Sequence, residues 1–230
     1  MFSNFDFGVI YASLGYLFWD GMSFTMLVTI VATVIGTVLG TLLAIMRLSG
    51  VWILSRLSGA YIDLIRSLPL VLIIFWFYFL VPYVGQWITG APRPVQVGAV
   101  LSTMLTFTLF EAAYFAEIMR AGIQSIPKGQ TAAGAALGLS PTQVMVSIIL
   151  PQAFRNMLPV LLTQTIILFQ DTSLVYVLSI TDFLGAASKV AHRDGRLVEM
   201  YLFAALIYFL ISLAASVYVR GLQRRYAIAR

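Results

Sequence analysis

Five apolar stretches, each close to membrane-spanning length, constrain this chain more than any other feature. They cover approximately residues 22–46, 70–84, 97–118, 157–180 and 200–219 of the 230-residue sequence. A helix needs about 20 apolar residues to cross the hydrocarbon core of a bilayer. In lipid, backbone groups must find hydrogen-bond partners within the protein, so an apolar stretch of this kind folds as a helix. The sequence therefore predicts an all-α, polytopic membrane protein with five transmembrane helices.

The composition agrees with a membrane protein. Sixty per cent of the residues are hydrophobic, 10% are charged, and the mean hydropathy is +0.95, whereas soluble domains carry about 25% charged residues. The net charge of +5 comes from cations at the ends of apolar stretches, so membrane topology explains it better than nucleic-acid binding. We find no repeat and no second domain, and expect residues 1–230 to form a single transmembrane domain. The first residues have no basic segment and include Asp6, which favours a short external or interfacial segment over a cleavable signal.

Several kinds of catalytic or metal site have no counterpart in the sequence. There is no cysteine, so a thiolate nucleophile or a cysteine metal site is excluded. The only histidine, His192, is expected to be a solvated residue in a polar external loop at residues 189–196. No Gly-x-x-x-x-Gly-Lys-Ser/Thr string occurs, and that string would be needed to hold a nucleotide phosphate. We therefore expect a non-catalytic chain without a metal site.

The basic residues predict the orientation in the membrane. The connections between stretches one and two and between three and four, together with the C-terminal end, carry ten of the 14 basic residues. The remaining four are Arg93, Lys189, Arg193 and Arg196. Because cytoplasmic loops are enriched in Lys and Arg, the N-terminus is predicted to be periplasmic and the C-terminus cytoplasmic.

Two further patterns describe packing in the membrane. Gly36 and Gly40 lie four residues apart in the first stretch, and small residues at this spacing let helices approach closely in lipid, although glycine tolerated in a long helix is a comparable interpretation. Residues 50–65 are amphipathic, and we expect them to lie along the cytoplasmic surface of the membrane.

The loop at about residues 121–156 is the strongest functional signal. Ser140, Pro141 and Gln143 match an N-cap serine, a proline at the first helical position and a glutamine at the third. The alanine-rich residues 130–137 predict a short helix that ends in a turn at Gly138. Two short helices joined by a glycine turn would form a compact knob on the cytoplasmic face, and a purely structural connection is the alternative.

Polar residues inside the apolar stretches are candidates for a solute pathway. They are Glu111, Gln164, Gln170 and Asp171, and ionisable groups at membrane depth usually face a cavity or a partner. The run Gln170-Asp171-Thr172-Ser173 is expected to break the helix, with Asp171 either capping the break or facing the pathway. Glu117 has Arg120 three residues further on, which favours a structural ion pair.

These motifs together resemble the permeases of ATP-binding-cassette importers. The pattern of that family is Glu-Ala-Ala, three residues, Gly, nine residues, Ile-x-Leu-Pro, and here it falls on Ala132, Ala133, Gly134, Gly138 and the run from Ile148 to Pro151. The spacing fits at every point, but the glutamate is replaced by Ala132 and the last alanine by Gly134. In this family the loop docks on an ATPase, so the resemblance implies a coupling role for Gln130, Ala132, Ala133, Gly134 and Gly138.

Further motifs narrow the resemblance to the polar amino-acid importers. Phe110-Glu111-Ala112-Ala113-Tyr114, the run from Gln170 to Tyr176, and Arg66-Ser67-Leu68-Pro69 look most like a permease subunit of a glutamate/aspartate importer. The resemblance implies a type I importer permease in a bacterial inner membrane. It also implies a second permease subunit, two ATPase subunits that bind ATP and Mg²⁺, and a periplasmic substrate-binding protein. The pathway would be lined by Glu111, Tyr114, Gln164, Gln170, Asp171, Thr172 and Ser173.

Alternatives to this interpretation remain at the level of sequence. The chain could be a passive channel or a secondary transporter, a scaffold that recruits a soluble partner, or an importer of another polar amino acid. In the family that the chain resembles, a lysine often stands at the position of Gln170. An acidic substrate beside Glu111 and Asp171 would therefore require a cation from elsewhere.

Overall fold

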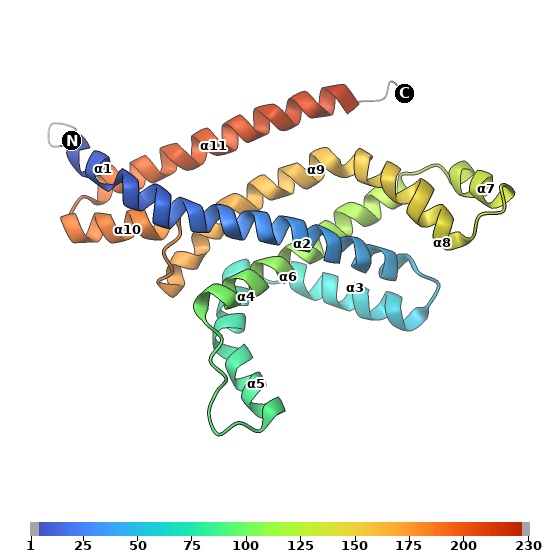
Figure 1. The fold of residues 1–230 in the computed structure, drawn as a ribbon, viewed down its shortest axis with the longest axis horizontal. Coiled ribbons are helices and arrows are strands. Elements are labelled where there is room, and N and C mark those ends of the chain that lie inside the picture. The colour runs from blue at the N-terminus through green and yellow to red at the C-terminus, as the bar shows by residue number, and fades with distance from the viewer. Residues whose placement is uncertain (1–4, 227–230) are drawn as a thin grey trace.

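The computed structural model describes residues 5–226, which form helices joined by short connections. Phe7–Gly15 (α1), the π-helical Tyr16–Met22 (η1) and Ser23–Leu48 (α2) form one continuous rod (Figure 1). The other elements follow in chain order: α3 Trp52–Arg66, α4 Leu70–Phe75, η2 Trp76–Leu80, α5 Val81–Thr89, α6 Ala99–Gln124, α7 Lys128–Ala136, α8 Pro141–Val144, η3 Met145–Ile149, α9 Leu150–Asp171, η4 Thr172–Leu178, α10 Phe183–Asp194 and α11 Leu197–Tyr226. Arg230 lies outside the described residues, and the side chain of Arg225 is not described.

Five segments are long and apolar enough to cross a membrane, as the sequence predicts. They are Phe7–Leu48, Leu70–Thr89, Ala99–Gln124, Pro141–Leu178 and Leu197–Arg224. The first is much longer than the expected 22–46, because the helix continues through Asp20 and Gly21 without a break. A Cβ atom at position 21 would lie 3.0 Å from Phe183 Cα. Glycine at this position therefore serves close packing on α10 rather than ending a helix.

Helices α2 and α6 make the most extensive contact among the helices of residues 5–226. A Cβ atom at position 40 would lie 2.8 Å from Ala112 O and from Ala116 N, and one at position 36 would lie 3.3 Å from Glu111 Cβ. The small-residue interpretation of Gly36 and Gly40 is therefore confirmed, because any side chain at position 40 would separate the two backbones.

Helix α3 does not lie flat at the membrane surface, contrary to the sequence prediction for residues 50–65. It runs back beside α2 and also packs on α6 (Figure 1). Ile62 is fully buried, and the hydroxyl of Tyr61 donates a hydrogen bond to Leu109 O at 2.6 Å. One side of the amphipathic helix therefore packs against protein, while Trp52, Ile53 and Leu57 on its first turns stay exposed.

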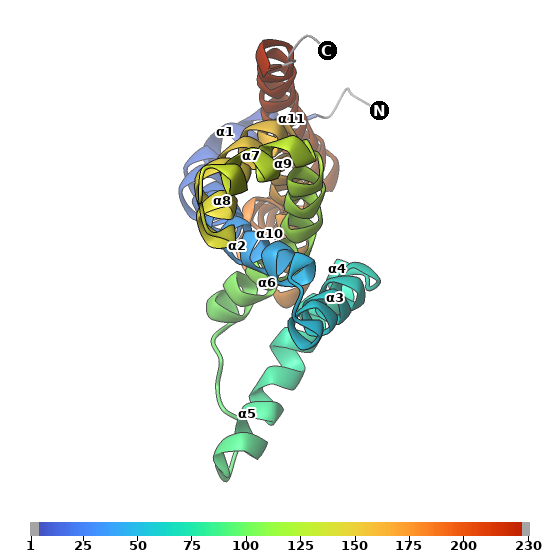
Figure 2. The same cartoon turned by 90° about the vertical axis from the view of Figure 1, so that its right-hand side faces the viewer.

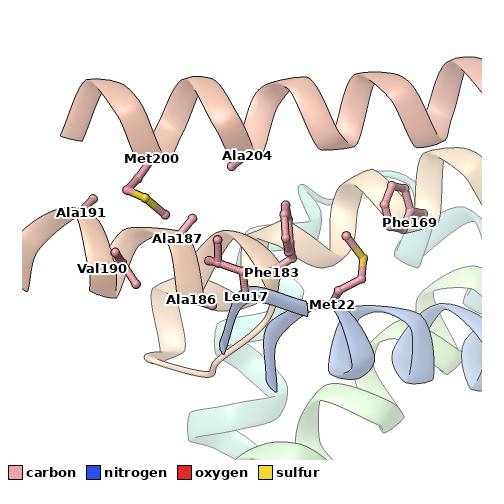
Figure 3. Packing of buried hydrophobic residues seen from close by; sticks show 10 residues of the cluster. All are labelled: Leu17, Met22, Phe169, Phe183, Ala186, Ala187, Val190, Ala191, Met200 and Ala204. Atoms are coloured by element: carbon pink, nitrogen blue, oxygen red, sulfur yellow. The ribbon is translucent and has the colours of Figure 1, made fainter. Parts of the chain in front are cut away.

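The two ends of the bundle are built differently. At one end, α10 and the first turns of the N-terminal rod enclose an apolar core with α11 and the end of α9 (Figure 3). Residues 189–194 belong to the last turns of α10 rather than to the predicted polar loop, and His192 is exposed there. At the opposite end, α7 and α8 lie near the loop between α2 and α3 (Figures 1 and 2).

The segment from α4 to α5 projects away from the bundle as an arm (Figures 1 and 2). Only 11% of the residues in its most apolar stretch are buried within the chain. Trp87 is 85% exposed and Ile88 is 73% exposed. These side chains are suited to contact with lipid or with another membrane subunit.

Candidate functional site

A buried carboxylate lies at the centre of the bundle, on α6. Glu111 is fully buried, and its two oxygens accept hydrogen bonds from Gln164 Nε2 at 3.3 and 3.1 Å. Gln164 lies on α9, so the bond joins the third and fourth membrane segments. Gly36 of α2 packs against the Cβ of Glu111 from the other side. A carboxyl group so enclosed is a strong candidate for a functional role, because burial of an ionisable group in a membrane segment is costly.

Asp171 extends this polar site by two turns of α9. It is seven residues beyond Gln164, which puts both on one helix face. It is half-buried and close enough to Glu111 and Tyr114 to interact with them electrostatically. The predicted capping role is not found: the Asp171 side chain makes no capping hydrogen bond, and the chain tightens from α9 into the 3₁₀-helical η4 without unwinding.

The rest of the predicted break has several different environments. Thr172 is buried, and its hydroxyl donates to Phe169 O at 2.7 Å. Ser173 is half-buried. Gln170 faces away from Glu111, because its Nε2 donates to Ser212 Oγ of α11 at 3.0 Å. The structure thus brings Glu111, Gln164 and Asp171 together and directs Gln170 to a helix contact.

Tyr114 connects this site to a cluster of charges nearer to α7. Its ring packs on the Phe110 ring in a tilted arrangement, with 4.9 Å between centroids, and the Arg66 guanidinium lies 5.4 Å from its centre. Arg66 ends α3 and comes only within 3.8 Å of Glu117. The sequence pattern singled out Arg66 for topology and family resemblance but not for this site.

Glu117 is the centre of that cluster. The predicted pair with Arg120 forms at 2.8 Å, and Arg47 of α2 approaches the same carboxylate at 2.7 Å. Arg47 also pairs with Asp63 of α3 at 3.2 Å. The i,i+3 spacing revealed only one of these contacts, since the others join helices far apart in the sequence. The cluster ties α2, α3 and α6 together at this end of the bundle.

The predicted knob forms from α7, a turn and α8. Gly138 has φ +77°, and Leu139 N donates to Gly134 O at 3.2 Å across the turn. Ser140 and Gln143 form the reciprocal capping box, with Gln143 N donating to Ser140 Oγ at 3.3 Å and Ser140 N to Gln143 Oε1 at 2.8 Å. Both helix boundaries were predicted from local residues and are confirmed.

The two departures from the family pattern occupy different environments. Ala132 is exposed, like Gln130 and Ala133. Gly134 is buried, and a Cβ atom there would lie 2.8 Å from Val144 Cγ2 and 3.0 Å from Ile148 Cδ1. Glycine at position 134 therefore lets α7 pack closely on the following helix. Leu137 is 79% exposed at the end of α7, and its place just before the glycine turn is the sequence signal that could have identified it.

The site offers proton exchange, hydrogen bonding and charge pairing, and the described residues contain no group of three potential metal-ligating His, Cys, Asp or Glu side chains. Its carboxylates can accept hydrogen bonds from an ammonium group, and the aromatic Tyr114 can contact a small organic solute.

Comparison with known proteins identifies relatives over nearly the full length. Residues 36–228 match the family model described as binding-protein-dependent transport system inner membrane component. The chain is 52% identical over 224 residues to the glutamate/aspartate import permease protein GltK of Escherichia coli O6:H1, covering 97% of this chain and 99% of the relative. It is 33% identical over 210 residues to the probable glutamine ABC transporter permease protein GlnP of Bacillus subtilis, with 90% and 92% covered.

Solved structures agree with this relationship. The chain superposes on an amino acid ABC transporter crystallised with histidines with a TM-score of 0.81 at 29% identity, covering 96% of this chain and 98% of that one. An inward-facing methionine ABC transporter, MetNI, has the same fold at 21% identity, with a TM-score of 0.66 and 90% and 96% covered. This chain therefore belongs to the family of binding-protein-dependent transport system inner membrane components, as a non-catalytic permease subunit.

Proposed function

We propose that this chain forms half of the translocation pathway of an ATP-driven importer for glutamate and aspartate. The observation that carries the proposal is the 52% identity over 97% of the chain to a permease whose name states that import. Relatives at 33–34% identity are named for glutamine and arginine. Import of another polar amino acid is therefore the second candidate.

The polar site supports binding of an amino acid near the middle of the membrane. Glu111 and Asp171 would accept hydrogen bonds from the α-ammonium group, while Gln164 holds Glu111 in place. Tyr114, Thr172 and Ser173 would line the same pathway, and Gln170 would contribute through its contact with α11. An acidic substrate side chain also requires a cation. Arg66 is suited to this role, because its side chain is 40% exposed and its approach to Glu117, at 3.8 Å, is long.

We infer that the knob transmits the conformational change driven by ATP hydrolysis to the membrane helices. Gln130, Ala132, Ala133 and Leu137 present an exposed surface that would enter a groove on an ATPase, and that ATPase would bind ATP and Mg²⁺. Ala132 has no carboxylate to offer such a groove. The docking energy would therefore depend more on apolar contact, including Leu137, than on charge.

The expected complex has two permease subunits, two ATPase subunits and one periplasmic substrate-binding protein. The exposed arm from α4 to α5 is suited to a second permease, because its apolar side chains have little cover within this chain. In this arrangement residues 1–230 act as a single transmembrane domain with a coupling loop at residues 121–156. The N-terminus would be periplasmic and the C-terminus cytoplasmic.

Reconstitution of the complete complex in proteoliposomes tests the proposal. With binding protein outside and ATP inside, labelled glutamate and aspartate should accumulate, and omission of ATP should abolish uptake. Preferential uptake of glutamine or arginine would support the second candidate. Uptake that persists without the ATPase would contradict the proposal and indicate a channel or secondary transporter.

A further inference from the structure

A polar cavity lies at the end of the bundle that carries the knob, between α2, α3 and α6. Its volume is about 750 Å³. The cavity opens where α2 turns into α3. On α6 its lining residues are Arg120 and Gln124, which lie more than two helical turns beyond Glu111. Three arginines line it, Arg47, Arg56 and Arg120, together with the carboxylate of Asp63. A concave site with this excess of guanidinium groups is suited to an anion.

The charges around the cavity do not balance. The surrounding cluster contains four arginines, Arg47, Arg56, Arg66 and Arg120, against the two carboxylates of Asp63 and Glu117. Two of the four positive charges therefore have no acidic counterpart within the cluster. Arg47 and Arg120 bind Glu117 on one side, while both remain part of the cavity lining.

Arg56 differs from the other two lining arginines. No described carboxylate pairs with it; instead its guanidinium lies 5.2 Å above the ring of Trp52, one turn earlier in α3. Both side chains line the cavity. The stacked tryptophan orients Arg56 while leaving its N–H groups available for an anionic ligand.

The surroundings of the cavity indicate that the anion belongs to a lipid. Trp52, Ile53 and Leu57 are 68%, 59% and 63% exposed on the first turns of α3. Tryptophan beside exposed aliphatic residues is typical of the boundary between headgroups and acyl chains. A soluble phosphate would gain nothing from this apolar surface, whereas acyl chains can cover it.

We propose that this cavity binds the phosphate group of an anionic phospholipid in the membrane leaflet on the side of the knob. Arg56 contacts the phosphate directly, and Arg47 and Arg120 contribute charge from the opposite wall. The acyl chains lie along the exposed apolar face of α3. Basic pockets between membrane helices are known to bind anionic headgroups. The lipid would join α2, α3 and α6 at the point where the ion-pair cluster already holds them.

The test uses the purified complete complex in detergent, titrated with phosphatidylglycerol, phosphatidylcholine or inorganic phosphate. Native mass spectrometry measures the lipid retained, and thermal melting measures stabilisation. Arg56→Gln should weaken phosphatidylglycerol binding about fivefold, which is what one basic contact with an anionic membrane surface is worth. Ala60→Leu, which fills the exposed cavity wall without changing charge, should weaken it as well.

Arg155→Gln is the matched control, because Arg155 is exposed on α9 and does not line the cavity. It removes the same charge and should bind phosphatidylglycerol as the wild type does. Equal losses in Arg56→Gln and Arg155→Gln would overturn the proposal in favour of diffuse surface charge. Stabilisation by inorganic phosphate equal to that by phosphatidylglycerol would also overturn it, since the ligand would then be a soluble anion. These outcomes do not depend on which amino acid the complex transports.

Discussion

Glu111 is the residue whose environment most demands a functional explanation. It is fully buried between α2, α6 and α9, with Gln164 as its hydrogen-bond donor. A fold that needed only a hydrogen bond at this point could use a residue that never ionises, because an ionisable group in a membrane segment is costly to bury. We therefore propose that Glu111 takes part in handling the solute.

Glu111→Gln should therefore lower the transport rate per assembled complex at least about tenfold, equivalent to about 1.4 kcal/mol, while assembly is unchanged. The variant keeps the shape and a hydrogen bond to Gln164 but removes the charge. Asp171→Asn should also reduce transport without destabilising the protein, because Asp171 makes no capping bond. Asp20→Asn, in an exposed part of η1, is the control. Unchanged uptake in both pathway variants would place the substrate site elsewhere, such as in the second permease.

Asp182 is a buried acid that caps a helix. It is fully buried, and its carboxylate accepts hydrogen bonds from Leu184 N and Gly185 N at 3.1 and 2.9 Å, capping α10. Burial raises its pKa from 3.8 to about 6, although the hydrogen bonds from Gly185 and Leu184 oppose the shift. The folded state holds this proton more tightly than the unfolded state does. The contribution of Asp182 to stability is therefore greatest below about pH 4 and is lost as the pH rises through about 6.

The melting temperature of the purified complex should reflect this titration. Between pH 4.5 and 7, the wild type should lose stability relative to Asp182→Asn by about 2 kcal/mol, at about 1.4 kcal/mol per pKa unit. At pH 7.5, Asp182→Ala should be less stable than Asp182→Asn by about 1 kcal/mol, because alanine cannot cap α10. Parallel pH profiles for the wild type and Asp182→Asn would contradict the assignment.

Local helix signals could be predicted from sequence, whereas contacts between helices could not. The Ser140–Gln143 capping box and the Gly138 turn involve neighbouring residues, so their pattern is visible directly. The approach of Arg47 to Glu117 joins residues 70 apart in the chain, and nothing in either segment specifies the partner. Residues 50–65 illustrate the same limit, because amphipathicity identifies a buried face but not whether lipid or protein covers it.

In the polar site, one prediction from sequence agrees with the structure and another does not, and the two glutamines concerned both lie on α9. Glu111 and Gln164 were identified individually because each interrupts an apolar stretch, and the structure joins them. Gln170 was identified by the same reasoning, yet it binds Ser212 on α11. Polarity in a membrane segment thus identifies residues that need partners. The rotation of the helix decides which of them face the same side.

The turn between α7 and α8 allows a sharp test of coupling. Gly138 has φ +77°, and nothing lies within 4 Å of a Cβ atom built there. Within this chain, a side chain at position 138 would meet no clash, so the effect of substitution on the turn itself comes from backbone strain. Gly138→Val should uncouple ATP hydrolysis from uptake, because a β-branched residue is strongly disfavoured at positive φ.

Gly138→Asn is the matched variant, since asparagine tolerates the left-handed region. It should retain most of the uptake per ATP hydrolysed, while Gly138→Val should lose most of it. The measurement is the ratio of labelled substrate transported to phosphate released. Equal ratios in the two variants would mean that the conformation of the turn does not govern transmission.

At the scale of the whole molecule, the positions of the basic residues predict which end of the bundle faces the cytoplasm. The knob and the loop between α2 and α3 lie at one end of the bundle, and α10 lies at the other with the start of the N-terminal rod (Figure 1). Lys128 is exposed at the first of these ends, and His192 is exposed on α10. Arg93 is exposed in the connection between α5 and α6.

Single cysteines at positions 93, 128, 192 and 225 test this orientation without background, because the chain contains no cysteine. An impermeant maleimide should label positions 93 and 192 in intact spheroplasts, whereas positions 128 and 225 should react only after permeabilisation. The reason is the excess of Lys and Arg in the connections assigned to the cytoplasm. Labelling at position 128 from outside would invert the topology. It would also separate the knob from any cytoplasmic ATPase, because a docking surface outside the cell cannot receive the energy of intracellular ATP.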